Sequence, residues 1–364
     1  MYLSLAANIR ESITAGAHQP GQMIASEHEL ARRENVSRVT VRRASELLIN
    51  EGLLERRPGK GLFVRALPSS TPRLLTVQVI AGNLAWEPCL QAARGVQSAA
   101  RAVGAQVQLH DAHGNEDDDL EVIRRLPDGP AHGAVIVALH SAAFVETLYS
   151  LKIRGFPFVL VDQRLRDLEV PSVLADNLAG GRQVGAHLLA LGHRRIGFIG
   201  DLEADTVQAR LAGLRDAVGD AGLPFDRALV TDLKPTDRLS DWTQQVLPQA
   251  RALLSQSNPP TAVFASCDAV ARAVYAAAFA KGLRIPEDLS VVGFDDDPLT
   301  NLLTPALTTV RQPFNAMGHA AFALLHGQIT APSAPVEHRV LAVELIVRQS
   351  TASAACVDTI PKVH

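Results

Sequence analysis

The chain has 364 residues, of which 47% are hydrophobic and 20% are charged, and its formal net charge is −3. These values are close to those of an average globular protein of two or three domains, and they exclude an extensively disordered or collagen-like chain. The most apolar stretch, residues 269–280, is interrupted by Arg272, so no run reaches the roughly 18 apolar residues of a membrane helix.

The N-terminus and the cysteines bear on the cellular compartment. Arg10 and Glu11 stand where a signal peptide would carry its apolar core, so we expect no export signal. Cys89, Cys267 and Cys356 lie far apart, which excludes a disulfide framework and a cysteine-rich zinc site. The sequence therefore predicts a cytoplasmic protein.

The charge is unevenly distributed along the chain. Residues 1–72 hold 10 basic and 7 acidic side chains, whereas the rest of the chain holds 25 basic and 31 acidic ones. A small basic segment ahead of a larger acidic body indicates that a polyanion binds to the first segment only.

The basic segment is predicted to contain three helices. An apolar residue at every fourth position from Leu5 to Ile13 predicts the first helix. A second helix begins at Ser26, which can form a capping box with Glu29, and ends near Asn35.

The third helix is predicted over residues 38–50, with Ser37 as its N-cap. Val41, Ala44 and Leu48 form its inner face, so the arginines near its start must lie on other faces. These are Arg38, Arg42 and Arg43. In a helix-turn-helix the start of the second motif helix meets the base edges, and arginine suits both guanine and phosphate. A hairpin follows, with strands over residues 53–57 and 62–64 and a basic, glycine-rich turn between them.

This segment resembles the winged helix-turn-helix of the GntR family of bacterial regulators. The stretch PGQMIASEHELARRENVSRVTVRRASELLINEGLLERRPGKGLFV follows the family's pattern almost without gaps, except that Ala25 replaces a proline and Leu62 replaces a threonine. The resemblance implies that double-stranded operator DNA is the partner, bound by the residues at the family's contact positions. These are His28, Ser37, Arg38, Thr40, Arg42, Gly59 and Lys60.

The proline-containing residues 67–73 are predicted to link a DNA-binding domain over residues 1–66 to a larger domain over residues 74–352, with a tail over 353–364. In the larger domain strands and helices alternate, which is typical of a parallel sheet covered by helices on both faces. The predicted strands are 74–81, 107–110, 134–139, 158–161, 196–199, 262–265 and 291–294. The predicted helices are 87–103, 118–126, 144–154, 181–191, 208–221 and 269–281.

This alternation contains a faint internal repeat. A predicted strand leads to Ala93-Arg94-Gly95-Val96 in the first half and to Leu211-Ala212-Gly213-Leu214 in the second. Two similar α/β halves would enclose a cleft at the carboxyl ends of their strands.

Polar and aromatic residues near the predicted strand ends are candidates for ligand contacts in this cleft. Carboxylates, an arginine and an amide pair with vicinal hydroxyls, and an aromatic ring covers the C–H face of a sugar, so the set favours a neutral polyhydroxylated ligand. The candidates are Asn83, Trp86, Asp162, Arg210, Cys267, Asp268, Asp295 and Gln312.

The body is similar to the effector domain of the LacI/GalR family, which itself is similar to periplasmic sugar-binding proteins. The similarity lies in LLALGHRRIGFIG, RLAGLRDAV, DLSVVGFDDDP and LTTVRQPFNAMGHAA. It implies that the sugar-contacting positions are Asp162, Arg210, Asp295 and Gln312. The family's usual Asn-Asp pair is Cys267-Asp268 here, and a thiol lacks the combined donor and acceptor of an amide.

A GntR-type head on such a body resembles the arabinose-repressor group. The expected fold class is α/β, with a small winged helix-turn-helix head and a two-lobed parallel α/β domain like that of periplasmic binding proteins. We expect a homodimeric repressor that is released from DNA when a small ligand, most simply a monosaccharide or a derivative of one, binds in the cleft.

Two alternatives remain open. The same architecture would serve a non-sugar effector such as a purine or a phosphosugar, because only details of the cleft would differ. An enzyme fused to the head, such as a pyridoxal-phosphate aminotransferase, would need a cofactor lysine after a strand in a much longer chain. The sequence contains no GxGxxG after the first strand of the body and no HExxH or GxSxG, so we expect no catalytic residue, cofactor or metal.

Overall fold

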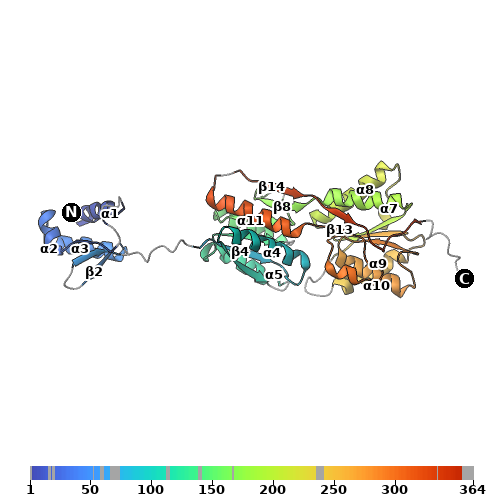
Figure 1. Ribbon diagram of the computed structural model, residues 1–364, viewed down its shortest axis with the longest axis horizontal. Helices are drawn as coiled ribbons and strands as arrows, with labels where there is room; N and C mark the ends of the chain where they lie inside the picture. Colours follow the sequence, from blue (N-terminus) through green and yellow to red (C-terminus); the bar gives the residue numbers. More distant parts are fainter. Residues whose placement is uncertain are drawn as a thin grey trace. The chain divides into compact units, whose positions relative to one another are not determined.

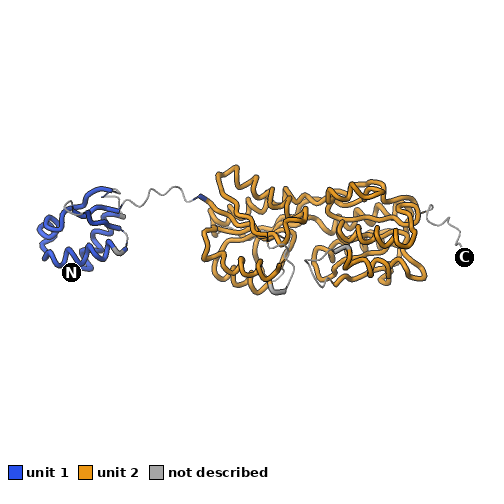
Figure 2. The backbone as a smooth tube through the Cα atoms, turned by 90° about the horizontal axis from the view of Figure 1, so that it is seen from below, with its two compact units in different colours: residues 1–74 blue, residues 75–364 orange. Residues whose placement is uncertain are grey.

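The structure is a computed structural model that describes residues 2–14, 18, 21–51, 53–57, 61–65, 74–111, 115–137, 142–165, 168–234, 242–333 and 335–354. The chain forms two compact units, Met1–Leu74 and Leu75–His364, which are coloured separately in Figure 2. Among the described residues, no helix is both long and apolar enough to cross a membrane.

The first unit packs three helices against a small antiparallel sheet. The helices are α1 (Tyr2–Thr14), α2 (Glu27–Arg33) and α3 (Arg38–Asn50). The strands are β1 (Met23–Ala25), β2 (Leu54–Arg57) and β3 (Gly61–Val64), in the order β1-β3-β2. The sequence predicted two strands here, and the structure adds a third, β1, which pairs with β3. Strand β1 was missed because its three residues are too few to show an alternating pattern.

The predicted helix signals in this unit are confirmed. Ser26 Oγ accepts a hydrogen bond from the Glu29 amide at 3.2 Å, and Glu29 Oε2 accepts one from the Ser26 amide at 2.8 Å. Ser37 Oγ caps α3 by accepting from the Thr40 amide at 3.2 Å. The inner-face residues of α3, Val41 and Leu48 among them, are fully buried. These contacts fix which face of α3 is left outside.

The first lobe of the second unit is a six-stranded parallel sheet with the order β14-β8-β7-β6-β4-β5. Helices α4 (Glu87–Ala102) and α11 (Phe314–Thr330) pack on one face, and α5 (Glu116–Arg125) and α6 (Ala142–Ile153) pack on the other (Figure 1). The strands are β4 (Thr76–Ala81), β5 (Gln106–Asp111), β6 (Gly133–Val137), β7 (Phe158–Val161), β8 (Ser172–Ala175) and β14 (His338–Leu341).

The second lobe repeats this design with a four-stranded parallel sheet, β10-β9-β11-β12. Helices α7 (Asn177–Ala190) and α8 (Asp205–Asp220) cover one face, and α9 (Trp242–Leu254) and α10 (Asp268–Ala280) cover the other. The strands are β9 (Ile196–Gly200), β10 (Val230–Asp232), β11 (Ala262–Ala265) and β12 (Ser290–Val292). Short 3-10 helices are η1 (Leu126–Asp128), η2 (Arg227–Leu229) and η3 (Pro298–Leu302).

Within the described ranges, three segments of the chain pass between the lobes. They connect β8 to α7, β13 (Thr309–Arg311) to α11, and β14 to β15 (Glu344–Ile346). Strands β13 and β15 form an antiparallel pair, with Val310 opposite Leu345. The sequence did not predict this pair, because each strand has only three residues.

The internal repeat marks a close helix crossing in each lobe. A Cβ atom at Gly95 of α4 would lie 2.0 Å from the backbone oxygen of Asn315 in α11. A Cβ atom at Gly213 of α8 would lie 2.2 Å from the backbone oxygen of Leu178 in α7. Both glycines are therefore required because two helix backbones touch there, and the repeat reflects the shared design of the lobes.

Candidate functional site

The structure places the arginines of α3 on the outer face of the first unit. Arg38, Arg42 and Arg43 are all exposed. Arg38 Nη2 lies 2.5 Å from Nδ1 of His28, which projects from α2. Arg42 pairs with Glu46 at 3.2 Å, and an exposed i,i+4 pair of this kind contributes under about 1 kcal/mol, so a phosphate can readily replace Glu46.

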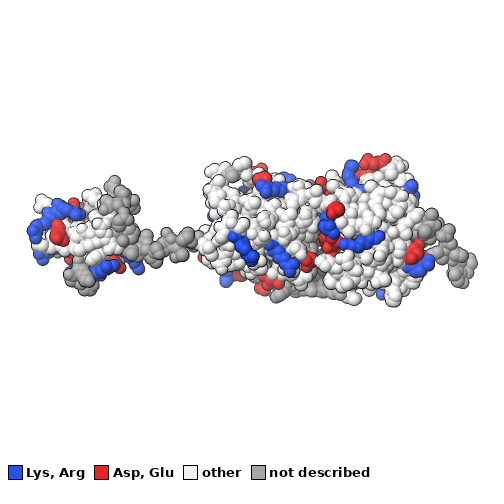
Figure 3. All heavy atoms as spheres, viewed as in Figure 1, with Lys and Arg blue, Asp and Glu red and all other residues white. Residues whose placement is uncertain are grey.

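The remaining predicted DNA contacts lie at the start of α3 and in the hairpin turn. The hydroxyls of Ser37 and Thr40 lie 2.9 Å apart at the helix N-terminus. The other two predicted contacts, Gly59 and Lys60, lie outside the described residues. Figure 3 shows basic side chains at the surface of this unit, as expected for a surface that meets a polyanion.

In the second unit, two candidate ligand carboxylates follow strand ends in unusual backbone conformations. Asp162 comes directly after β7 with φ 59°, and Asp295 lies just past β12 with φ 127°. A backbone hydrogen bond holds each residue in place. The Asp162 amide donates to Val173 O at 3.0 Å, and the Asp295 amide donates to Val310 O at 2.8 Å. Positive φ at a residue other than glycine is strained and is enriched at binding sites.

Arg210 is the central cation of this region. Its side chain is buried on α8, where Nε donates to Asn177 Oδ1 at 2.8 Å and Nη1 donates to Ser266 O at 2.5 Å. The guanidinium carbon lies 3.9 Å from the centre of the Phe294 ring, and Nη1 lies 4.0 Å from Asp295 Oδ1. Arg210 is therefore held in one orientation beside the Asp295 carboxylate.

Gln312 joins this group from the segment between β13 and α11. Its Nε2 donates to Asp295 Oδ1 at 2.7 Å. Two buried acceptors in the group, Gln312 Oε1 and Asp162 Oδ1, have no hydrogen-bond partner among the described residues. Buried polar atoms in native proteins are almost always paired, so these two oxygens indicate where donors of a ligand would bind.

The two carboxyl groups share this single guanidinium. Burial raises the pKa of Asp162 to about 6, although Arg210 acts in the opposite direction. Burial also raises the pKa of Asp295 to about 7, against the lowering effects of Arg210 and the Gln312 hydrogen bond. Asp162 belongs to the first lobe and Arg210 to the second, so these interactions join the two lobes.

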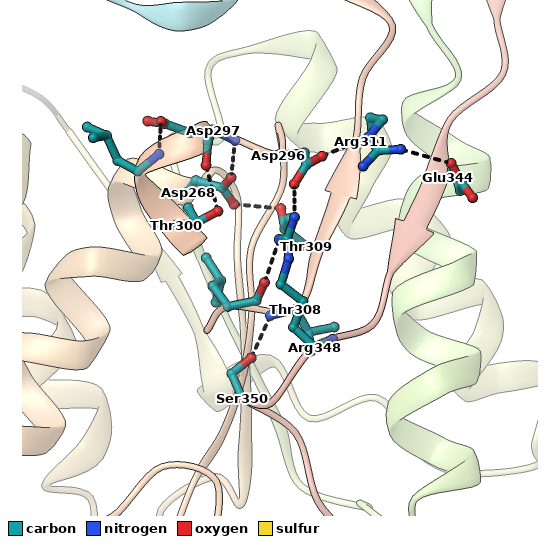
Figure 4. Close-up of polar contacts among 12 residues, drawn as sticks. Asp268, Asp296, Asp297, Thr300, Thr308, Thr309, Arg311, Glu344, Arg348 and Ser350 are labelled. Carbon is teal, nitrogen blue, oxygen red and sulfur yellow. Dashed lines mark hydrogen bonds and ion pairs between the residues drawn. The ribbon is translucent and has the colours of Figure 1, made fainter. Parts of the chain in front are cut away.

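The neighbouring candidates Cys267 and Asp268 open α10. Burial raises the pKa of the Cys267 thiol to about 12, so Cys267 is a neutral thiol beside Asp295. Asp268 is 1% exposed, and both of its oxygens are engaged inside the protein (Figure 4). Oδ1 accepts from the Thr309 hydroxyl at 2.6 Å and Oδ2 from the Asp297 amide at 2.8 Å. Asp268 thus holds the loop that carries Asp295.

A second set of contacts in Figure 4 fixes the same loop from the other side. Asp296 pairs with Arg348 at 2.5 Å and with Arg311 of β13 at 2.7 Å. Arg311 also reaches Glu344 of β15 at 3.4 Å. The loop is therefore tied to the strands on which the chain passes between the lobes.

Asn83 and Trp86 follow β4, at the same edge of the first sheet as Asp162. Asn83 Oδ1 accepts from the Ala85 amide at 2.8 Å, and Trp86, which is 37% exposed, is the N-cap of α4. The structure therefore groups the other six candidates by contact or charge and places these two on the first lobe beside them.

Two residues of this region were missed by the sequence reasoning. Asn177, which orients Arg210, is the first residue of α7, and the sequence placed the start of that helix four residues later. The N-cap Asp176, which accepts from the Ala179 amide, was the available signal. Gln163 follows Asp162, and its buried Nε2 has no partner among the described residues.

A winged helix-turn-helix together with a two-lobed domain whose polar residues converge between its lobes defines a ligand-responsive DNA-binding protein. No group of three or more His, Cys, Asp or Glu side chains within the described ranges is arranged to hold a metal ion.

Comparison with known families agrees with this class. Residues 1–64 match the model of bacterial regulatory proteins of the gntR family, and residues 186–351 match that of the periplasmic binding protein-like domain. The arabinose metabolism transcriptional repressor of Geobacillus stearothermophilus is 29% identical over 96% of this chain and 97% of that protein. The HTH-type transcriptional regulator MalR of Streptomyces coelicolor is 35% identical over 66% of this chain and 70% of that protein.

Solved structures give the same result. The transcriptional regulator CelR in complex with cellobiose is 28% identical, with a TM-score of 0.68 over 86% of this chain and 91% of that one. A LacI family transcriptional regulator from Enterococcus faecium with bound ribose is 27% identical, with a TM-score of 0.65 over 76% of this chain and 99% of that one.

The chain belongs to the LacI-type transcriptional regulators and carries a GntR-type head. It is a DNA-binding regulator with a ligand-binding C-terminal domain, as the sequence predicted.

Proposed function

We propose that this regulator is a repressor that leaves its operator when a neutral sugar binds between Asp162, Arg210, Asp295 and Gln312. The observation that carries the proposal is a pair of buried acceptors, Asp162 Oδ1 and Gln312 Oε1, for which the described part of the chain offers no hydrogen-bond partner. A buried unpaired acceptor costs about 1–3 kcal/mol, and sugar hydroxyls supply the missing donors. The cellobiose and ribose bound to the two solved relatives support a carbohydrate ligand.

The charge of the site favours a neutral sugar over a phosphosugar. Arg210 already donates to Asn177 and Ser266 and faces the carboxyl groups of Asp162 and Asp295. A phosphate would add about 1.5 to 2 negative charges next to these carboxyls.

The ligand is tested first by a thermal-shift screen of neutral sugars, phosphosugars and purines. A ligand at 100 times its dissociation constant adds about 2.7 kcal/mol of stability. Arg210→Gln is then expected to weaken binding of the identified sugar in calorimetry by about 2–3 kcal/mol, while operator binding without ligand is kept. The exposed Arg251→Gln on α9 is the matched control. Stabilisation only by phosphosugars or purines, or unchanged affinity in Arg210→Gln, would contradict the proposal.

Operator reading by α3 is tested separately. Arg38→Ala is expected to cost about 1–3 kcal/mol and to relax base preference, because the variant loses a contact to a base edge. Lys60→Ala is expected to weaken binding evenly across sequences and to reduce its salt dependence. An equal loss on all duplexes in Arg38→Ala would show that Arg38 contacts only the phosphates.

We further propose that the protein acts in the cytoplasm as a homodimer on a pseudo-palindromic operator. Strand β5 is an edge of the first sheet, and apolar side chains on it and just before it in the sequence are exposed: Leu109 by 49% and Val103 by 52%. Leu109→Arg is expected to give monomers in analytical ultracentrifugation, whereas Ile153→Arg, at an exposed apolar position of α6, is expected to leave the dimer intact. Dimers in both variants would place the interface elsewhere.

A further inference from the structure

A pocket of about 500 Å³ lies on the second lobe, between α8, η2 and the start of β10. Its apolar lining includes Leu202, Leu211, Phe225 and Val230, which are half-buried and pack against the core beneath α7 and α8. The volume falls within the range of small-molecule sites, about 300–1,000 Å³.

Two guanidinium groups line the same pocket. Arg215 extends from α8 and Arg227 from η2, and both are exposed. Within the part of the chain that the structure describes, neither forms an ion pair or a hydrogen bond, and no acidic side chain lines the pocket. Two like charges therefore line a largely apolar pocket, and its described lining holds no protein anion to balance them.

The nearest carboxylates along the chain are already engaged elsewhere. Asp216, next to Arg215, is paired with Arg182 at 3.0 Å. Asp226, next to Arg227, lies 3.5 Å from Arg195. These pairings leave the two pocket arginines available to an external anion.

We propose that this pocket binds a small organic anion with an apolar or aromatic body, and so provides a second effector site. The two guanidinium groups would hold a carboxylate, sulfonate or phosphate, which arginine binds through paired charge-assisted hydrogen bonds. Phe225 and the aliphatic residues would cover the body of the ligand. The pocket is lined by α8, the helix that also carries Arg210. A ligand bound in the pocket would therefore shift the orientation of α8 and of Arg210. The proposal does not depend on the identity of the sugar.

The probe for this site is 1-anilinonaphthalene-8-sulfonate, an aromatic anion whose fluorescence rises in apolar surroundings. N-phenyl-1-naphthylamine has the same rings without the sulfonate and is the matched neutral probe. Titrations use the full chain in its wild-type form, in the double variant Arg215→Gln/Arg227→Gln, and in Arg251→Gln as the control for an exposed arginine. Circular dichroism melts show whether each variant is folded.

Saturable binding of the anionic probe by the wild type and by Arg251→Gln is expected, with at least about tenfold weaker binding in the double variant. The neutral probe should bind wild type and double variant alike. The variant Leu211→Asn, which makes the apolar lining of the pocket polar, should weaken the binding of both probes. Absence of saturable binding to the wild type would overturn the proposal, and so would equal binding of the anionic probe by the folded double variant.

Discussion

Asp162 and Asp295 are carboxylic acids held where water is largely excluded, and a single guanidinium balances both. A folded-state pKa above the ordinary value of 3.8 means that the folded protein holds its protons more tightly than the unfolded chain does. The contribution of such a group to stability is fully present below pH 4 and is lost as the pH rises through the folded-state pKa. These two carboxyl groups are therefore expected to contribute less to the stability of the ligand-free body at pH 7 than at pH 4.

Asp162→Asn isolates the contribution of one of these groups. The rise in pKa from 3.8 to about 6 corresponds to about 3 kcal/mol. Between about pH 4 and pH 7 the wild type is expected to lose up to about this much stability relative to the variant, because the loss is complete only about one unit above the folded-state pKa, and the difference should be constant at higher pH. Urea denaturation at each pH measures it. A difference that is independent of pH, or that grows in the opposite direction, would contradict the burial of Asp162.

Among the elements, the crossings α4–α11 and α7–α8 depend on glycine. Gly213 touches the backbone of α7, whereas Gly219, on the same helix α8, has open space around its Cβ position. Both glycines lie on α8, but only Gly213 is in contact with another helix. Alanine at Gly219 is therefore a matched control for alanine at Gly213.

Gly213→Ala is expected to lower the free energy of unfolding by about 1–3 kcal/mol, because the methyl group would force the two helices apart. Gly219→Ala is expected to be neutral or stabilising by up to about 1 kcal/mol, because alanine is the better helix former. Chemical denaturation of the two variants measures the difference. Equal effects at the two positions would mean that α7 and α8 are not in backbone contact at Gly213.

The elements that the sequence predicted are those with strong local signals. The N-cap Ser37 and the buried stripe of α3 predicted that helix to the residue, and strands β7 and β11 follow from short apolar runs. The prediction lacked helices α9 and α11 and five strands of the body: β8, β10, β13, β14 and β15. Of these, β13 and β15 are three-residue strands stabilised by a partner distant in sequence. In the candidate site, Asp162, Arg210, Asp295 and Gln312 were candidates both from their positions along the predicted strands and helices and from the family resemblance, and they stay predictions. Asn177 could not be named in advance, since its role depends on a contact between two helices.

At the scale of the whole molecule, the head and the body are separate compact units. The predicted boundaries, residues 1–66 for the head and 67–73 for the linker, stay predictions because residues 66–73 lie outside the described ranges. We propose that ligand and operator communicate through this predicted linker, because the two half-sites of an operator lie about 34 Å, or a multiple of that, apart.

A flexible Gly/Ser insertion after Pro68 is expected to weaken this communication. Ligand-induced release from DNA, normally worth about 1–3 kcal/mol of coupling, should fall toward zero, while the affinity for the ligand stays unchanged. Fluorescence anisotropy with labelled operator, with and without ligand, measures the coupling. Wild-type coupling in the insertion variant would require a direct contact between head and body.

The order of the first lobe's elements in the sequence determines when this lobe can fold during synthesis. Helix α11 and strand β14 complete this lobe, yet they follow almost the entire second lobe in sequence. Domains generally fold from the N-terminus as the chain leaves the ribosome, so the head can fold as soon as Val64 has emerged, long before the chain of the first lobe is complete. Until then, the face that Met317 and Leu325 will bury is open to water and to proteases. Chains that stop early would retain a DNA-binding head without a complete ligand-binding domain to control it.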